Sequence, residues 1–406
     1  MKKPKIRFKG YQEDWEQRKF ADFTWDAGKR NKEDLDLEPY AITNEHGFIR
    51  QRDAHDDFGY MKDTDRKAYN IVQPNSFAYN PARINVGSIG YYKGVENVIV
   101  SSLYEVFQTD NYVNDRFLWH WLKSDEFPRW IEKLQEGSVR LYFYYDKLCE
   151  CQLYMPSLEE QEKIATFLDD LDHLITLHQR KCEETKTLKK YMLQKMFPQN
   201  GHSVPEIRFS GFTEDWEQRK LGELGSLKNG MNFSKEAMGI GFPFVNLQNI
   251  FGNNVIDVTN LGKAMASDSQ LKDYNLLNGD VLFVRSSVKL EGVGEAALVP
   301  QNLENTTYSG FIIRFRDEYG LDNNFKRFLF GIESVRNQIM AQATNSANKN
   351  ISQTVLENLC LKIPNKSEQE KIGLYFSNLD HLITLHQHKC EELQNIKKFM
   401  LKNMFI

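Results

Sequence analysis

Apolar residues recur at alternating spacings of three and four along residues 158–197, which is the pattern of one face of a long helix. These positions are Ile164, Leu168, Leu171, Ile175, Cys182, Met192 and Met196. No proline or glycine interrupts the stretch before Pro198. The stretch returns at residues 366–405, with 24 identities in 40 positions at a constant offset of 208. The sequence therefore predicts two copies of one helix, each roughly 55 to 60 Å long.

Polar positions of this helix repeat as well. His178, Thr185 and Lys189 are polar residues at heptad positions of the apolar face. A two-stranded contact should therefore be loosened at these positions, or they should face something other than the second copy of the helix. If the two helix copies served only to pack against other elements, their apolar positions alone would need to agree. The repeated LDHLITLHQ is also identical at its polar positions. We expect these to present one surface to the same kind of partner, although a recent recombination that copied the helix would give the same identity. They are Asp172, His173, Thr176 and Gln179 in the first copy, and Asp380, His381, Thr384 and Gln387 in the second.

A second repeat precedes each variable region. PKIRFKGYQEDWEQRKF at residues 4–20 returns as PEIRFSGFTEDWEQRKL at residues 205–221. We call these two stretches the opening segments. Their shared Trp15 and Trp216 are expected to anchor each segment to its own domain.

Residues 21–157 and 225–365 share almost nothing beyond a sparse skeleton. The β-branched and aromatic runs NVIVSS, YEVF, VLFV and FIIRF favour strands, and helices are predicted over residues 115–134 and 323–341. The matching positions are Phe77-Ala78-Tyr79 and Gly90 against Val281-Leu282-Phe283 and Gly294, and Ser101 and Phe107 against Ser309 and Phe315. Each variable region is therefore predicted to be an α+β domain.

Composition narrows the class of protein. A chain of 406 residues suits two or three domains. No apolar run is long enough to cross a membrane and the N-terminal MKKPKIRF has no apolar h-region, so we expect a cytoplasmic protein with no membrane partner. Five scattered cysteines form no C-x-x-C pair, which predicts reduced thiols and no metal site. A net charge of −4 means that any contact with nucleic acid must be local or shared with a partner.

The order of these parts resembles the specificity subunit of Type I restriction-modification systems, over essentially the whole chain. The resemblance is carried by the duplicated EQEKI and LDHLITLHQ helices, which follow two dissimilar domains in the contexts MPSLEEQEKI and IPNKSEQEKI. It implies a target recognition domain over residues 1–157, a conserved spacer helix over 158–197, a second target recognition domain over 198–365 and a second spacer helix over 366–406.

The resemblance also implies a fold class and partners. The expected fold is α+β, with two target recognition domains separated by two long antiparallel coiled-coil helices in an internal pseudo-twofold repeat. The expected partners are double-stranded DNA, of which each domain reads one half of a split target, two modification (methyltransferase) subunits and the restriction (translocase and nuclease) subunits. S-adenosylmethionine, ATP and Mg would then bind to the partner subunits, with no cofactor in this chain.

Signatures of catalysis are missing from the sequence. There is no G-x-x-x-x-G-K-[ST] phosphate loop and no H-E-x-x-H metal pair. Asn80-Pro81-Ala82-Arg83 lacks the second proline and the aromatic residue of the amino-methyltransferase signature. We therefore predict a protein that is not an enzyme and has no catalytic or metal-binding residues.

Base readout uses Arg or Lys toward guanine and Asn or Gln toward adenine. Two loop regions in each half carry this mixture, residues 79–92 with 137–147, and residues 285–289 with 345–350. The candidate DNA-binding residues are Tyr79, Arg83, Asn85, Lys93, Arg140, Tyr142 and Tyr144 in the first half, and Arg285, Ser286, Lys289, Asn348, Lys349 and Asn350 in the second. The alternative function is a coiled-coil scaffold whose two domains bind proteins. A self-sufficient methyltransferase or nuclease would need the motifs that are missing.

Overall fold

The computed structural model describes residues 3–44, 47–54, 66–138, 140–199, 201–344 and 348–406. Its contacts divide the chain into two compact units. Unit 1 comprises residues 1–178 and 388–406, and unit 2 comprises residues 179–387. Each long helix therefore contributes one part to each unit. No helix among the described residues combines the length and the apolar character needed to cross a membrane.

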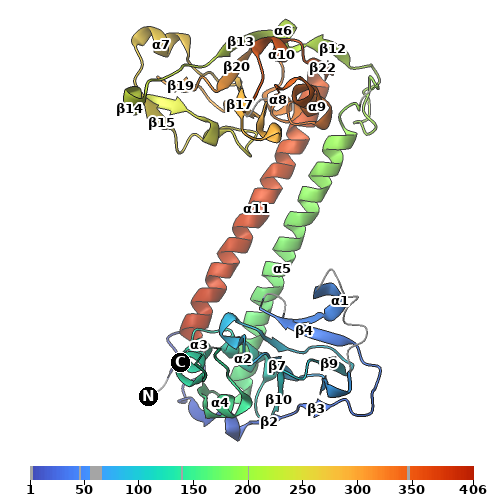
Figure 1. Cartoon of the computed structure of the whole chain (residues 1–406), viewed down its shortest axis with the longest axis vertical. Helices are drawn as coiled ribbons and strands as arrows, with labels where there is room; N and C mark the ends of the chain where they lie inside the picture. Colours follow the sequence, from blue (N-terminus) through green and yellow to red (C-terminus); the bar gives the residue numbers. More distant parts are fainter. Residues whose placement is uncertain (1–2, 45–46, 55–65, 139, 200, 345–347) are drawn as a thin grey trace. The chain divides into compact units, whose positions relative to one another are not determined.

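Among the described residues, unit 1 contains sheets ordered β1-β11, β2-β10-β7-β8 and β3-β6-β9-β4-β5. Their strands are β1 (Glu16–Lys19), β2 (Thr24–Asp26), β3 (Lys29–Arg30), β4 (Pro39–Thr43), β5 (Gly47–Arg50), β6 (Asn70–Val72), β7 (Phe77–Tyr79), β8 (Ile89–Tyr91), β9 (Val98–Val100), β10 (Glu105–Thr109) and β11 (Gln152–Met155). Several of these strands are labelled in Figure 1. The α-helices are α1 (Gln51–Ala54), α2 (Asp115–Leu122), α3 (Glu126–Leu134), α4 (Tyr145–Glu150), the first part of α5 (Leu158–Lys195) and the last part of α11 (Lys366–Met404). Short 3-10 turns are η1 (Phe20–Asp22), η3 (Arg66–Ala68) and η4 (Ile84–Val86).

Unit 2 contains sheets ordered β12-β22, β13-β20-β16-β18, β15-β14-β19 and β17-β21. Their strands are β12 (Glu217–Lys220), β13 (Gly225–Asn229), β14 (Met238–Val245), β15 (Gly262–Ala264), β16 (Val281–Val284), β17 (Ser286–Ser287), β18 (Ala296–Leu298), β19 (Thr307–Tyr308), β20 (Ile312–Asp317), β21 (Lys349–Asn350) and β22 (Cys360–Ile363). The α-helices are α6 (Leu221–Leu224), α7 (Asp268–Asp273), α8 (Asn323–Leu329), α9 (Glu333–Gln342), α10 (Gln353–Glu357), the last part of α5 and the first part of α11 (Lys366–Met404). The 3-10 turns are η5 (Lys235–Ala237), η6 (Leu247–Asn249) and η7 (Leu290–Gly292).

A four-stranded antiparallel sheet is common to the two variable domains. β10 pairs with β7 so that Phe107 lies opposite Phe77, and β20 pairs with β16 so that Phe315 lies opposite Val281. The α+β prediction is therefore confirmed, as is the match of Phe77 and Phe107 with Val281 and Phe315. The match between Gly90 and Gly294 is wrong, because Gly90 lies inside β8 whereas Gly294 precedes β18 and has a φ of 67°.

Each predicted helix of a variable domain is two helices. Residues 115–134 form α2 and α3, and residues 323–341 form α8 and most of α9. Ser124 ends α2 by donating from its hydroxyl to the carbonyl of Trp121, 2.7 Å away. Pro128 lies in the first turn of α3, where its missing N–H is tolerated. The helical spacing of apolar residues continues across the break between α2 and α3 and across that between α8 and α9, so periodicity alone did not reveal either break.

The opening segments are built into the units. β1 pairs with β11 and β12 pairs with β22, each just before a long helix begins. Trp15 and Trp216 are both buried, and each is only 4% exposed. Trp15 packs against Phe117 of α2, and Trp216 packs against the equivalent Phe325 of α8. The anchoring role that the sequence predicts for these tryptophans is confirmed.

Candidate DNA interface and docking helices

The two candidate DNA-binding loops of the first variable domain lie against each other. This variable domain (residues 21–157) is called domain 1, and the second (residues 225–365) is called domain 2. The backbone N–H of Phe143 donates to the carbonyl oxygen of Pro81, 3.0 Å away. Glu136 and Tyr142 exchange two backbone hydrogen bonds of 2.9 and 2.8 Å. The first loop follows β7 and the second leads into α4, so the sheet and the helix together position them. Arg83 and Arg140 are both exposed on these loops.

The same pairing occurs in domain 2. Ile351, which is equivalent to Phe143 at the offset of 208, donates from its N–H to the carbonyl oxygen of Arg285 at 3.0 Å. β17 then pairs with β21, so that Ser286 lies opposite Asn350. Residues 345–347 of the predicted loop lie outside the described residues. In both domains the structure thus brings together two loops, and the residues that pair are 62 to 66 positions apart in the sequence.

Residues at equivalent places on the loops differ between the domains. Tyr142 and Tyr144 stack with their rings at 2° and their centroids 5.5 Å apart, and Tyr144 is about half exposed. The position of Tyr142 is occupied in domain 2 by Asn350, whose side-chain amide donates to the carbonyl of Asn348 at 2.8 Å. One domain therefore presents an aromatic pair where the other has Asn350 and Ser352.

Two predicted residues lie elsewhere. Tyr79 is 0% exposed in the core of domain 1, so the prediction that its side chain contacts DNA is wrong. Lys93 follows the end of β8 that lies farther from the loop pair, since Ile89 at the other end pairs with Tyr79. Its ammonium lies 4.0 Å from a carboxylate oxygen of Asp169 on α5. The remaining candidates lie on the paired loops: Arg83, Asn85, Arg140, Tyr142, Tyr144, Arg285, Ser286, Lys289, Asn348, Lys349 and Asn350.

The EQ of the repeated EQEKI faces inward at the start of α5. Glu160 accepts from Nε and Nη2 of Arg7 at 2.7 and 2.8 Å, and its side chain is 1% exposed. The adjacent Gln161 accepts from the backbone N–H of Asn114, which caps α2, and donates to the carbonyl of Pro156. These two side chains therefore join the opening segment and the variable domain to the long helix.

Unit 2 repeats this arrangement at the start of α11. Glu368 accepts from Nε and Nη2 of Arg208 at 2.6 and 2.7 Å. Gln369 accepts from the backbone N–H of Asp322, the cap of α8, and donates to the carbonyl of Pro364. Identity at the first two positions of EQEKI is thus explained by contacts inside each unit.

Within each unit the beginning of one long helix packs beside the end of the other, in antiparallel directions (Figure 1). Asp172 of α5 pairs with Lys397 of α11 at 2.5 Å in unit 1. In unit 2 the equivalent Asp380 pairs with Lys189 at 2.5 Å and with Arg327 of α8 at 2.7 Å. The expectation that Lys189 loosens the seam is wrong, because a carboxylate of the other helix neutralises it.

These ion pairs change the interpretation of the repeated polar positions. Asp172 and Asp380 match because each neutralises a lysine of the neighbouring helix. The hydroxyls of Thr176 and Thr384 donate to the backbone carbonyls of these same aspartates. His173, Gln179, His381 and Gln387 are exposed.

Comparison with known proteins bears on the whole chain. The family model described as the Type I restriction modification DNA specificity domain matches residues 12–187 and 213–395. The chain belongs to this family. It is 24% identical over 410 residues to the Type I restriction enzyme MjaVIII specificity subunit of Methanocaldococcus jannaschii, covering 95% of this chain and 91% of the relative. It is 25% identical to the EcoKI specificity subunit of Escherichia coli over 280 residues, which cover 66% of this chain and 59% of that relative.

Solved structures show the same fold. The chain superimposes on the Type I system S subunit from M. genitalium with a TM-score of 0.58 at 14% identity, covering 100% of this chain and 99% of that one. The HsdS subunit from Thermoanaerobacter tengcongensis gives 0.51 at 15% identity, with 97% of both chains covered. Membership in a specificity family confirms the predicted function class and decides against the scaffold and the self-sufficient enzyme. It is also consistent with a chain that holds no cofactor.

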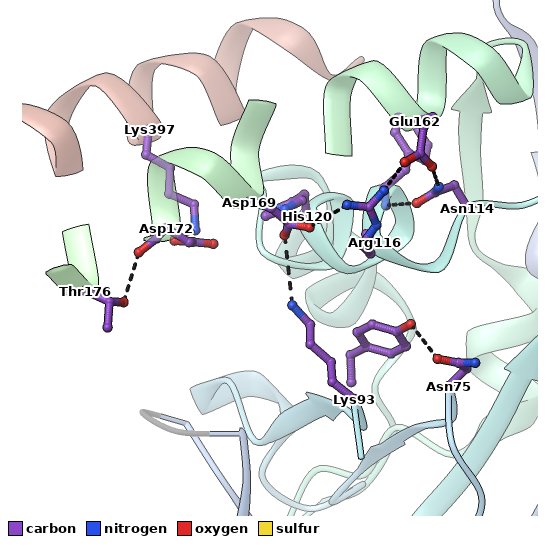
Figure 2. Close-up of polar contacts among 12 residues, drawn as sticks. Asn75, Lys93, Asn114, Arg116, His120, Glu162, Asp169, Asp172, Thr176 and Lys397 are labelled. Carbon is purple, nitrogen blue, oxygen red and sulfur yellow. Dashed lines mark hydrogen bonds and ion pairs between the residues drawn. The ribbon is translucent and has the colours of Figure 1, made fainter. Parts of the chain in front are cut away.

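In this specificity subunit, domain 1 and α5 are joined by a charge network whose residues are not repeated in domain 2. Figure 2 shows Arg116 between Glu162 and Asp169, with Lys93 reaching Asp169 from the strand side. The buried His120 contacts the same carboxylate through Nε2 at 2.9 Å. At the offset of 208, domain 2 has Asn324, Phe328 and Ser377 in place of Arg116, His120 and Asp169.

Electrostatics of this network follow from burial. Burial lowers the pKa of His120 and outweighs its hydrogen bond with Asp169. Burial alone would raise the pKa of Asp169, but the hydrogen bond with His120 and the nearby cations hold it below its usual range. Among the described residues, His120, Asp169 and Asp172 form the one group with metal-ligand spacing. Since Arg116, Lys93 and Lys397 already neutralise its carboxylates, the donor set does not suit a cation.

Exposed apolar residues of the helices were missed in the sequence. Leu174 and Leu382 are equivalent and are 39% and 41% exposed. Tyr191 and Phe399 are also equivalent and are 48% and 56% exposed. They could have been found in the sequence as apolar residues that occur at equivalent positions of both helix copies but outside the apolar face on which the helices pack.

Proposed function

We propose that this specificity subunit reads a split DNA target, one half with each variable domain, in the cytoplasm. The observation that carries the proposal is the loop pair. Each domain places two loops together on the same sheet framework, and equivalent positions hold different side chains. Phosphate contacts position such a protein, whereas side chains that reach base edges specify the sequence.

Base contacts are assigned to exposed or half-exposed residues of the loops. In domain 1 they are Arg83, Asn85, Arg140, Tyr142 and Tyr144, and in domain 2 they are Arg285, Ser286, Lys289, Asn348, Lys349 and Asn350. Arg285 also donates to the carbonyl of Gly310 at 3.3 Å, which fixes its guanidinium beside the loop pair. Arg140 favours guanine, and Asn348 at the equivalent place favours adenine.

The exposed repeated positions of the helices are proposed to bind two copies of a methyltransferase subunit. The polar ones are His173, Gln179, His381 and Gln387, and the apolar ones are Leu174, Tyr191, Leu382 and Phe399. An apolar residue that stays exposed at equivalent places suits a symmetric pair of partners. S-adenosylmethionine would bind to those subunits, and ATP and Mg to restriction subunits that join them.

Spacing between the half-sites is assigned to the long helices. A helix of 38 residues such as α5 is about 57 Å long. Half-sites one DNA turn apart are separated by about 34 Å. Adding or removing helical turns in α5 and α11 should therefore change the number of base pairs between the half-sites.

The test is to co-express the chain with its methyltransferase subunit and map methylated adenines across the host genome by single-molecule sequencing. We expect a split motif that disappears when this chain is omitted. Exchanging residues 21–157 for those of another family member should change one half of the motif only. A change in both halves, or a stable complex that produces no methylation in any exchanged variant, would contradict the proposal.

A further inference from the structure

Domain 2 has a cavity of about 510 Å³ beside its loop pair. Its lining includes Ser286, Ser287 and Asn348 from the paired loops and the side chains of Phe251, Val288 and Phe311. The volume lies within the range of sites that hold a small ring compound. The cavity is thus continuous with the proposed DNA interface.

Aromatic and apolar walls dominate this cavity although it is open to solvent. Phe311 is 57% exposed, Val288 is 78% exposed and Phe251 is 38% exposed. Gly292 allows the close packing behind them, because a Cβ there would lie 2.4 Å from Oγ of Ser287 and 3.1 Å from Cε1 of Phe251. Exposed aromatic rings next to a DNA-reading loop are the chemistry on which a base stacks.

Charged groups of the cavity restrict what can enter. Glu291 and Glu295 line it, and the carboxylate of Glu295 accepts from the backbone N–H of Gly252 at 3.0 Å. Two carboxylates oppose entry of a phosphate but accept hydrogen bonds from an exocyclic amino group. Lys289 also lies on the lining and can neutralise a phosphate outside.

We propose that this cavity receives one base unstacked from the half-site that domain 2 reads, and that it prefers a base with an exocyclic amino group, which is cytosine, adenine or guanine, over thymine. The proposal rests on the proposed function, because the cavity is built from the loops assigned to DNA contact. Phe311 supplies the stacking surface and Glu291 accepts from the amino group. Asn348 and the serines bind the remaining polar edge.

Domain 1 provides a matched control. The residue equivalent to Phe311 at the offset of 208 is Leu103, which is 74% exposed but is not aromatic. Phe311→Ala and Leu103→Ala therefore remove exposed apolar side chains at corresponding places, and only the first removes a stacking surface. Since both side chains are exposed, neither change should impair folding.

The experiment measures binding of the full chain, with the methyltransferase subunits it assembles with, to duplexes that are fully paired or carry one bulged base. A bulge supplies a base that is already unstacked, so the cost of extrusion is removed. We expect a bulged cytosine or adenine to bind roughly tenfold more tightly than the paired duplex or an abasic bulge. Phe311→Ala should abolish this gain and Leu103→Ala should retain it. Glu291→Gln should equalise bulged cytosine and bulged thymine.

Each outcome decides one claim. Salt-sensitive binding to paired DNA without a gain from bulged cytosine or adenine overturns the cavity proposal and leaves the proposed function standing. A gain that persists in Phe311→Ala places the unstacked base elsewhere and also overturns it. No salt-sensitive binding to any duplex overturns the proposed function itself.

Discussion

Replacing Glu160 by alanine should lower the free energy of unfolding of unit 1 by about 3 kcal/mol. The change removes two charge-assisted hydrogen bonds to Arg7, of 2.7 and 2.8 Å. Each such bond contributes about 1.5–3 kcal/mol, and stranding a buried charge costs about 3–5 kcal/mol. Arg7 keeps 12% of its side chain exposed, so water recovers part of the loss and the lower end applies. The guanidinium of Arg7 stays charged when it is stranded, because arginine is not deprotonated in proteins.

Calorimetry of the full chain measures this loss. For a unit of about 200 residues, 3 kcal/mol corresponds to a fall in Tm of roughly 6–12 °C. Hydrogen exchange at β1 and β11 assigns the change to unit 1. Glu368→Ala should do the same to unit 2, and the two effects should add because the sites are independent.

Arg18→Ala is the matched control for this prediction. Arg18 belongs to the same opening segment and pairs with Glu16, but both side chains are exposed, at 45% and 70%. Its removal should leave Tm unchanged. If Glu160→Ala shifted Tm no more than Arg18→Ala does, the internal explanation of EQEKI would be refuted. The motif would then have to be explained by contacts with a partner.

Two further results are expected. Asp380→Asn should destabilise unit 2 by about 1–2 kcal/mol in urea unfolding, because it leaves the cations of Lys189 and Arg327 without their carboxylate. Asp172→Asn leaves one such cation, that of Lys397, and should destabilise unit 1 less. Equal effects would contradict the role of Arg327. Burial lowers the pKa of His120, so the native state binds its proton less readily than the unfolded chain, whose histidine titrates near pH ~6.5. The stability of unit 1 should therefore fall as pH drops below about 6.5. His120→Phe, which copies Phe328, should flatten that part of the pH profile, and an unchanged slope would exclude this imidazole as its source.

Element type and domain order could be predicted because they depend on local pattern. The helix predicted over 158–197 is observed as Leu158–Lys195, and its copy ends at Met404. Strands were found from β-branched and aromatic runs. Tyr79 was misplaced because β7 is buried on both faces, with Phe77 and Tyr79 in one core cluster and Ala78 in another. A strand without polar alternation gives no signal of which side chain reaches solvent.

The direction in which a repeated residue faces could not be predicted. Asp172 and Lys397 are 225 positions apart, and only antiparallel packing of α5 on α11 brings them together. Identity between copies is the same whether the shared contact is internal or with a partner. The pairing of the loops could not be predicted for a related reason. A backbone hydrogen bond such as that from Phe143 to Pro81 does not require a particular side chain, so it leaves no pattern in the sequence.

The way the variable domains are attached explains how they can diverge. Gln161 and Gln369 hold them through the backbone N–H groups of Asn114 and Asp322, which every residue except proline provides. The pairing of β1 with β11, and of β12 with β22, likewise uses backbone groups. The ion pairs Arg7–Glu160 and Arg208–Glu368 join the opening segments to the long helices, so both partners of each pair lie outside the variable regions. Side chains on the loops can therefore change with the DNA half-site while the attachment of each domain keeps its hydrogen bonds.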